Sequence, residues 1–124
     1  MDTKYAYSII SCADMDDARI MIDALLQAKL APCVQAYPTK SFYVWEEKIW
    51  TDVEEIILKV LCKREDFERI KTTVVEVSRA NNLKNVEPEV NLIPIMDGAQ
   101  SYLDWIDEVT SSTYTVTGTT RRIL

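Results

Sequence analysis

Histidine is absent from the 124 residues, and glycine occurs only twice. Without histidine the chain cannot build a Ser-His-Asp triad, use an imidazole general base or offer imidazole ligands to a metal. The two glycines, Gly98 and Gly118, stand alone, which excludes a glycine-rich phosphate loop and a dinucleotide-binding fingerprint. No serine, cysteine or lysine has an identifiable base to activate it as a nucleophile. The sequence therefore predicts no catalytic site.

Cysteine is scarce, and its spacing is irregular. The three cysteines, Cys12, Cys33 and Cys62, predict reduced thiols rather than a disulfide framework. Cys33 stands at the start of a predicted strand and is expected to act as a small buried hydrophobe. The alternative is a metal site in which the thiolates of Cys12 and Cys62, at the ends of neighbouring central strands, bind one ion.

Basic residues are outnumbered, with 14 Lys and Arg against 20 Asp and Glu and a net charge of −6. This balance argues against nucleic acid as a partner. The basic pairs Lys63-Arg64 and Arg121-Arg122 are interpreted as solvated surface charge, although either offers a contact point. No run approaches the roughly 20 apolar residues of a membrane span, and the start lacks the pattern of a signal peptide. We therefore expect a cytoplasmic protein without membrane insertion.

Hydrophobic residues make up 48% of the chain, enough for one core. Their periodicity predicts strands at residues 5–12, 33–45, 49–61 and 90–95 and helices at residues 14–30, 65–80 and 101–108. This βαββαβ order with a terminal helix predicts an α+β, ferredoxin-like sandwich, in which two helices cover one face of a four-stranded antiparallel sheet. We assign residues 1–109 to this domain and residues 110–124 to a polar, mobile tail, in which residues 114–117 are an alternative edge strand.

Prolines and aromatic residues refine this prediction. Pro38 and Pro94 each mark an edge strand or a bulge, because proline cannot donate to a sheet ladder. The third helix is expected to pack Tyr102, Leu103 and Ile106.

The second and third strands are joined by a short turn around Glu46-Glu47, which predicts a long hairpin. Its tip carries Tyr43, Trp45 and Trp50. Aromatic side chains at a strand tip are poorly covered by a lone subunit, so we expect a second copy of the chain to cover them.

Several motifs follow one another at consistent spacing between residues 9 and 108. They are Lys29-Leu-Ala-Pro-Cys-Val, Ser41-Phe-Tyr-Val-Trp-Glu-Glu-Lys, Glu54-Glu55, Leu58-Lys59, Pro88-Glu89 and Ser101-Tyr-Leu-Asp-Trp-Ile. Together they resemble the CutA family of divalent-cation tolerance proteins. The resemblance implies a ferredoxin-like subunit in a PII-like homotrimer whose hairpins are exchanged between neighbours. It also implies a non-enzymatic role in tolerance or homeostasis of copper or another divalent cation.

Three departures from the family pattern bear on that role. Cys12 is displaced by two positions from the family cysteine, and Asn82-Leu-Lys-Asn-Val-Glu replaces a His-Pro-Tyr run. The proposed copper ligands are therefore not reproduced. Glu47 stands where the family usually has glycine, which is costly if that position needs a positive φ.

The resemblance implies a cleft between subunits formed by residues of the matched motifs: Tyr43, Trp45, Lys59, Glu89, Tyr102 and Trp105. Lys59 and Glu89 would orient a small anion or a metal-bearing ligand in an aromatic-lined pocket. The alternative is a structural ion pair among interface aromatics. A second function also stays open, that of a PII-like signalling or scaffold trimer that binds a small ligand or a protein partner in this cleft.

Overall fold

The computed structural model describes residues 3–122. Its elements, in chain order, are β1 (Tyr5–Cys12), α1 (Met15–Gln27), β2 (Cys33–Trp45), β3 (Lys48–Lys63), the 3-10 turn η1 (Arg64–Asp66), α2 (Phe67–Ala80), β4 (Val90–Pro94) and α3 (Gln100–Thr110). The predicted order of strands and helices is confirmed.

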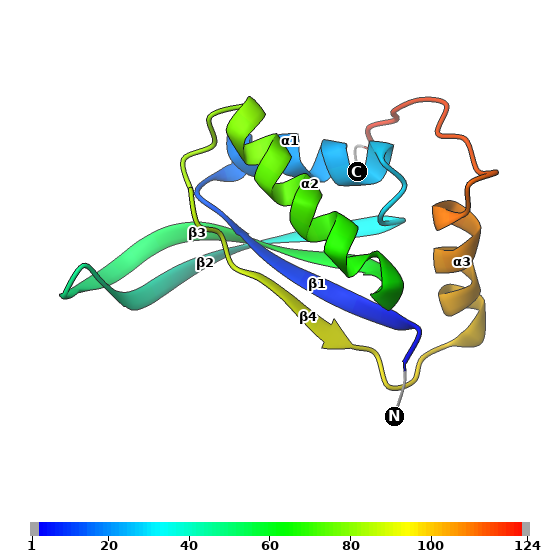
Figure 1. Cartoon of the computed structure of the whole chain (residues 1–124), viewed down its shortest axis with the longest axis horizontal. Coiled ribbons are helices and arrows are strands. Elements are labelled where there is room, and N and C mark those ends of the chain that lie inside the picture. The colour runs from blue at the N-terminus through cyan, green and yellow to red at the C-terminus, as the bar shows by residue number, and fades with distance from the viewer. Residues whose placement is uncertain (1–2, 123–124) are drawn as a thin grey trace.

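The four strands form one sheet in the order β2-β3-β1-β4, and every neighbouring pair is antiparallel. Helices α1 and α2 lie together on one face of this sheet (Figure 1). The arrangement is the predicted ferredoxin-like α+β fold. Pro38 and Pro94 lie in the two edge strands, β2 and β4, where a missing backbone N–H leaves no central ladder unpaired.

The main core lies between the sheet and these two helices. It buries alternate residues of β1 and β3 against one stripe of each helix: Ala6, Ile10, Leu58, Val60, Met21, Leu25, Ile70 and Val74. Each large aliphatic side chain removed from water stabilises the fold by about 1.5–3 kcal/mol. This layer therefore holds the sheet in place, and the opposite face is left for other contacts.

Local hydrogen bonds set the ends of the helices. The Asp14 carboxylate accepts the Asp17 N–H at 2.9 Å and so caps the N-terminus of α1. The helix ends at Gln27, before the predicted end near Leu30, because Lys29 adopts φ 58° and the Leu30 N–H turns back to the Leu25 carbonyl. Helix α2 starts at Phe67 rather than at residue 65, because residues 64–66 form the 3-10 turn.

The hairpin of β2 and β3 projects beyond the helices (Figure 1). Trp45 pairs with Lys48, so the turn consists of Glu46 and Glu47 alone, at φ 52° and 63°. A two-residue turn of this kind requires positive φ at both positions. The position of Glu47 does need a positive φ, so the conformational cost expected for a residue other than glycine is present there. The hairpin also bends at a bulge, where Thr51 and Asp52 lie opposite Phe42.

Helix α3 covers one end of the opposite face of the sheet. Leu103 and Ile106 pack on Leu61 of β3. The expected packing of Tyr102 is wrong, because its side chain is 41% exposed. Leu103 and Ile106 occupy the buried stripe at a spacing of three residues, and Tyr102 lies about 100° around the helix from Leu103. Cys33 is half-buried rather than fully buried beneath this helix.

Residues 111–122 form neither helix nor strand, so the alternative edge strand at residues 114–117 is not present. The segment returns from α3 toward α1 (Figure 1). The Lys29 ammonium holds its first part by donating to the carbonyl oxygens of Ser112 at 3.3 Å and Tyr114 at 2.8 Å.

Candidate functional site

The sheet face that α1 and α2 leave open carries a lysine among aromatic rings. Strand register places Lys59 beside Ile9 of β1 and Gln35 of β2. The Lys59 Nζ lies 4.5 Å from the ring centroid of Tyr7 and 6.0 Å from that of Tyr37. An ammonium over an aromatic face is attracted by the negative centre of the ring. The Lys59 ammonium, the positive charge expected at the site, is therefore positioned by the rings of Tyr7 and Tyr37.

A groove of about 560 Å³ opens where β1 stops and the hairpin continues. Cys12, the last residue of β1, pairs with Ile56, so β3 loses its neighbour on that side from there to the tip. One wall is the hairpin, with Tyr43 and Trp45. The other wall is the loop that leads into β4, residues 84–89.

Hydrogen bonds to β1 and α1 position this loop. The Ser11 hydroxyl accepts from the Asn85 side-chain amide at 3.2 Å and from the Glu89 N–H at 2.8 Å. The Lys84 N–H donates to the Asp17 carboxylate at 2.9 Å, and the Lys84 ammonium pairs with Asp14. The Asp17 N–H and Lys84 lower the pKa of Asp14 below its usual value. The loop is thus tied to the rest of the fold at the rim of the groove.

The charge of the groove is negative. Glu54, Glu55, Glu87 and Glu89 line it, and none of the four forms an ion pair with another residue of the described part of the chain. Its lysine, Lys84, is already neutralised by Asp14. Clustered carboxylates in a concave surface attract cations. Of the two ligands expected from sequence, a small anion or a metal-bearing ligand, the negative groove disfavours the small anion.

The six residues of the expected cleft fall into three places within one subunit. Tyr43, Trp45 and Glu89 line the groove. Lys59 points to Tyr7, and between residues 3 and 122 no ion pair joins it to Glu89, whose carboxylate accepts from Asn91 at 2.8 Å. The remaining two lie elsewhere.

Tyr102 and Trp105 form an aromatic pair on α3, with ring centroids 5.7 Å apart. Both rings are exposed, by 41% and 36%. Sequence reasoning had not included Glu54, Glu55 and Glu87 among the site residues. Glu54-Glu55 stood in a matched motif, but nothing in the sequence signalled that the loop of Glu87 faces it.

Comparison with known proteins now identifies the family. A family model described as CutA1 divalent ion tolerance protein matches residues 6–109. The chain belongs to the CutA family. A divalent-cation tolerance protein CutA of Archaeoglobus fulgidus is 33% identical over 99 residues, which are 80% of this chain and 91% of that protein. A CutA homolog of Danio rerio is 32% identical over 81% of this chain, which spans 63% of its length.

Solved CutA structures confirm the fold. The A. fulgidus CutA structure superposes with a TM-score of 0.79 at 31% identity and covers 86% of this chain and 99% of its own. CutA1 of Shewanella sp. SIB1 gives the same TM-score at 28% identity, covering 90% of this chain and 100% of its own.

The names of CutA relatives place them in different compartments. The A. fulgidus structure is described as periplasmic, and an Oryza sativa relative as chloroplastic. The cytoplasmic location expected for this chain therefore stays a prediction. None of the helices within residues 3–122 has the length and apolarity to cross a membrane.

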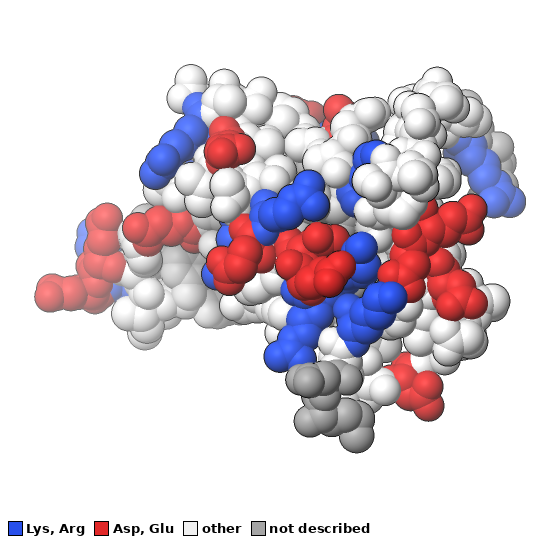
Figure 2. Space-filling model, turned by 45° about the vertical axis from the view of Figure 1, so that its right-hand side comes forward, with Lys and Arg blue, Asp and Glu red and all other residues white. Residues whose placement is uncertain are grey.

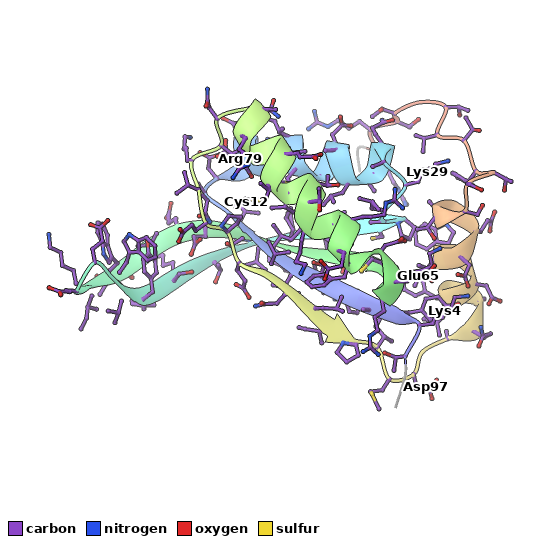
Figure 3. The ribbon with its side chains drawn as sticks, viewed as in Figure 1. Lys4, Cys12, Lys29, Glu65, Arg79 and Asp97 are labelled. Atoms are coloured by element: carbon purple, nitrogen blue, oxygen red, sulfur yellow. The ribbon has the colours of Figure 1, made fainter. Side chains whose placement is uncertain are left out.

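The cysteines do not form the metal site considered for this CutA chain. Cys12 pairs with Ile56 and Cys62 with Ala6, at opposite ends of β1 and about 20 Å apart at roughly 3.3 Å per residue. Figure 3 shows Cys12 at the end of β1 distant from Lys4. Burial raises the pKa of Cys12 to about 11 and that of Cys62 to about 12, so both thiols are protonated near neutral pH.

A wider search of the described residues gives the same result. Residues 3–122 hold no group of three or more Cys, Asp or Glu arranged to bind a metal ion. Within this part of the chain, a copper centre with three or more such ligands from one subunit is therefore not present.

Proposed function

We propose that this CutA-family chain acts as a non-enzymatic homotrimer in divalent-cation tolerance or homeostasis, with copper as a candidate cation. The observation that carries the assembly is apolar surface on the projecting hairpin. Phe42, Val44 and Ile49 are 62%, 71% and 76% exposed, next to Trp45 and Trp50. Contiguous apolar surface of this kind is typical of a protein interface.

Unpaired strand edges support the same proposal. The outer edges of β2 and β4 have no neighbour within the described sheet, and β3 has none on one side beyond Ile56. Exposed edges offer backbone groups to another chain. In a ring of three copies, the hairpin of each subunit covers the next one, and the ring closes without free ends.

Sedimentation equilibrium tests the assembly. A trimer has a mass of about 43 kDa, three times the 14.3 kDa of one chain. The double variant Val44→Glu/Ile49→Glu places charge on the exposed hairpin and should dissociate the trimer. Val75→Glu, on an apolar position of α2 that is 45% exposed, is the control away from the hairpin and should keep the trimer mass. A wild-type mass near 14 kDa contradicts the proposal.

The role in cation tolerance needs a separate test. Cells that lack their own CutA protein are grown on rising copper concentrations with wild-type chain, the hairpin double variant or empty vector. Wild-type chain should extend growth to higher copper, and the double variant should not. Equal growth with wild-type chain and empty vector contradicts the role. Calorimetry with Cu(I) and Cu(II) shows whether the assembled protein binds the ion itself.

A second candidate function is a PII-like signalling or scaffold module that binds a small ligand or a partner between subunits. Lys59, without an ion-pair partner in residues 3–122, and the aromatic wall of the groove favour it. Lys59→Ala and Glu89→Ala should then abolish ligand-induced thermal shifts and leave the mass unchanged. Dissociation of either variant instead indicates a structural ion pair across the interface.

A further inference from the structure

Two features of opposite charge form no ion pairs among residues 3–122 of one subunit. The groove carries four glutamates without ion pairs among residues 3–122, next to the rings of Tyr43 and Trp45. Arg121 and Arg122 are exposed near the end of the chain and also form no ion pair with a described residue. The tail that carries them lies outside residues 6–109, which the CutA family model matches. It is therefore a feature of this chain that family membership does not explain.

We propose that Arg121 and Arg122 of one copy dock in the acidic groove of a neighbouring copy. The proposal rests on the homotrimer proposed above. Guanidinium groups bind carboxylates through paired hydrogen bonds and stack on aromatic rings. The glutamates and the two rings of the groove supply both kinds of partner. Occupation by two cations also relieves the mutual repulsion of the carboxylates.

The geometry of the tail assigns the contact to a second copy. Lys29 fixes Ser112 and Tyr114 beside the end of α1, on the helix side of the sheet. The next eight residues, 115–122, extend by at most about 29 Å. The groove opens on the other face and at the hairpin end, and α3 and the hairpin lie at opposite ends of the molecule (Figure 1). The tail therefore runs on the helix side of the sheet, and its own groove opens on the opposite face.

The projecting hairpin carries acidic side chains, and so does the side of the molecule on which α3 lies (Figure 2). The basic partner that this second side can offer is therefore the tail with Arg121 and Arg122, not α3 itself. In a head-to-tail ring, the hairpin end of one subunit meets the α3 end of the next, where the tail begins. The tail of the next copy then lies within reach of the acidic hairpin.

A peptide titration tests the recognition. The full chain with Arg121→Glu and Arg122→Glu, which cannot fill the groove, is titrated with a peptide of residues 111–122, and tryptophan emission is followed. The natural peptide should bind saturably and more weakly as salt rises from about 0.05 to about 0.5 M. The peptide with both arginines changed to glutamate should bind at least about tenfold more weakly. Equal binding of both peptides, or no binding of the natural one, overturns the proposal.

Variants of the groove provide the matched control. Glu87→Gln/Glu89→Gln should weaken binding of the natural peptide several-fold, because both residues line the groove. Glu76→Gln removes one carboxylate from the exposed face of α2 and should leave binding unchanged. If Glu76→Gln weakens binding to the same degree, the net charge of the protein rather than the groove determines binding, which contradicts the proposed site.

Cysteine cross-linking tests whether the contact is between copies. One chain carries Arg122→Cys, the other carries Glu87→Cys, and both carry Cys33→Ser. Oxidation after co-expression should give a disulfide-linked pair, and Glu76→Cys in place of Glu87→Cys should not. A trimer mass without cross-linking refutes the tail contact and leaves the assembly intact. A monomer mass refutes the assembly. The peptide titration still tests whether the groove binds the tail in that case, because it needs only one subunit.

Discussion

The turn at the hairpin tip allows a quantitative stability prediction. Glu46 and Glu47 occupy the left-handed region at φ 52° and 63°. A residue with a Cβ pays about 1–2 kcal/mol there, and glycine does not. Glu47→Gly removes this cost but adds flexibility to the unfolded chain, which offsets about 0.4–1 kcal/mol. We expect a net stabilisation of about 0.5–1 kcal/mol.

The measurement is urea unfolding at one fixed protein concentration, since assembly makes apparent stability depend on concentration. The corresponding rise in melting temperature is about 2–5 °C. Glu47→Ala is the matched control, because it removes the same carboxylate and keeps a Cβ at positive φ. Its change in stability measures the repulsion between the adjacent carboxylates, because the backbone cost at residue 47 stays the same.

Two results would refute the reasoning about the turn. If Glu47→Ala stabilises the protein as much as Glu47→Gly, charge repulsion rather than backbone conformation is the cause. If neither variant moves the unfolding midpoint, the tip opens locally before the cooperative transition, and its backbone cost does not enter global stability.

Three further predictions concern buried or paired polar groups. Ser8 is fully buried, and its hydroxyl has no hydrogen-bond partner in residues 3–122, so Ser8→Ala should raise the free energy of unfolding by about 1 kcal/mol. Partial burial raises the pKa of Asp107, but hydrogen bonds from Tyr5 and Lys4 outweigh this and bring it below 3.8. Its stabilising contribution is therefore present above pH 3.8 and lost as pH falls through the lower folded pKa, so wild type should lose more stability than Asp107→Asn on acidification. A thiol reagent near pH 8 should label Cys33 first and the other two cysteines only on unfolding.

Controls separate these effects from general ones. Ser101→Ala, at an exposed position of α3, should change stability by less than about 0.5 kcal/mol. Asp104→Asn lies on the same helix without an ion pair to a described residue and should keep the acid sensitivity of wild type. Mass spectrometry after digestion assigns the labelled thiol. Early labelling of Cys12 would contradict the burial that raises its pKa.

The type and order of the helices and strands could be predicted because each of them buries one face, which gives its apolar residues a regular spacing. Ile70 and Val74 recur at helical spacing and are both buried, and Asp14 caps the helix that follows it. The choice between two apolar stripes could not be predicted. On α3, Leu103 and Ile106 are buried, whereas Tyr102 and Trp105 have the same spacing and face outward. Only the position of the sheet decides which stripe is covered.

The candidate site depended on strand register, which sequence spacing does not reveal. Lys59 pairs with Ile9, and Asn91, the hydrogen-bond partner of Glu89, pairs with Ile9 from the other side. Lys59 and Asn91 are thus two strand spacings apart, about 10 Å, with Ile9 between them, and the Glu89 carboxylate accepts from Asn91 while Lys59 lies over Tyr7. The aromatic motif and Glu89 do meet, because the hairpin runs on past the end of β1.

The length of the hairpin therefore has two consequences. Strand β3 has 16 residues and β1 has 8, so the unpaired part of β3 exposes both the apolar surface proposed for assembly and the groove proposed for recognition. In the proposed trimer a neighbouring subunit approaches this same segment. Binding in the groove and association of subunits then use the same surface. A change in the free energy of binding in the groove must therefore change the free energy of trimer association. Neutralising the groove glutamates should accordingly change the salt dependence of trimer dissociation, and an unchanged dependence would show that the two surfaces act independently.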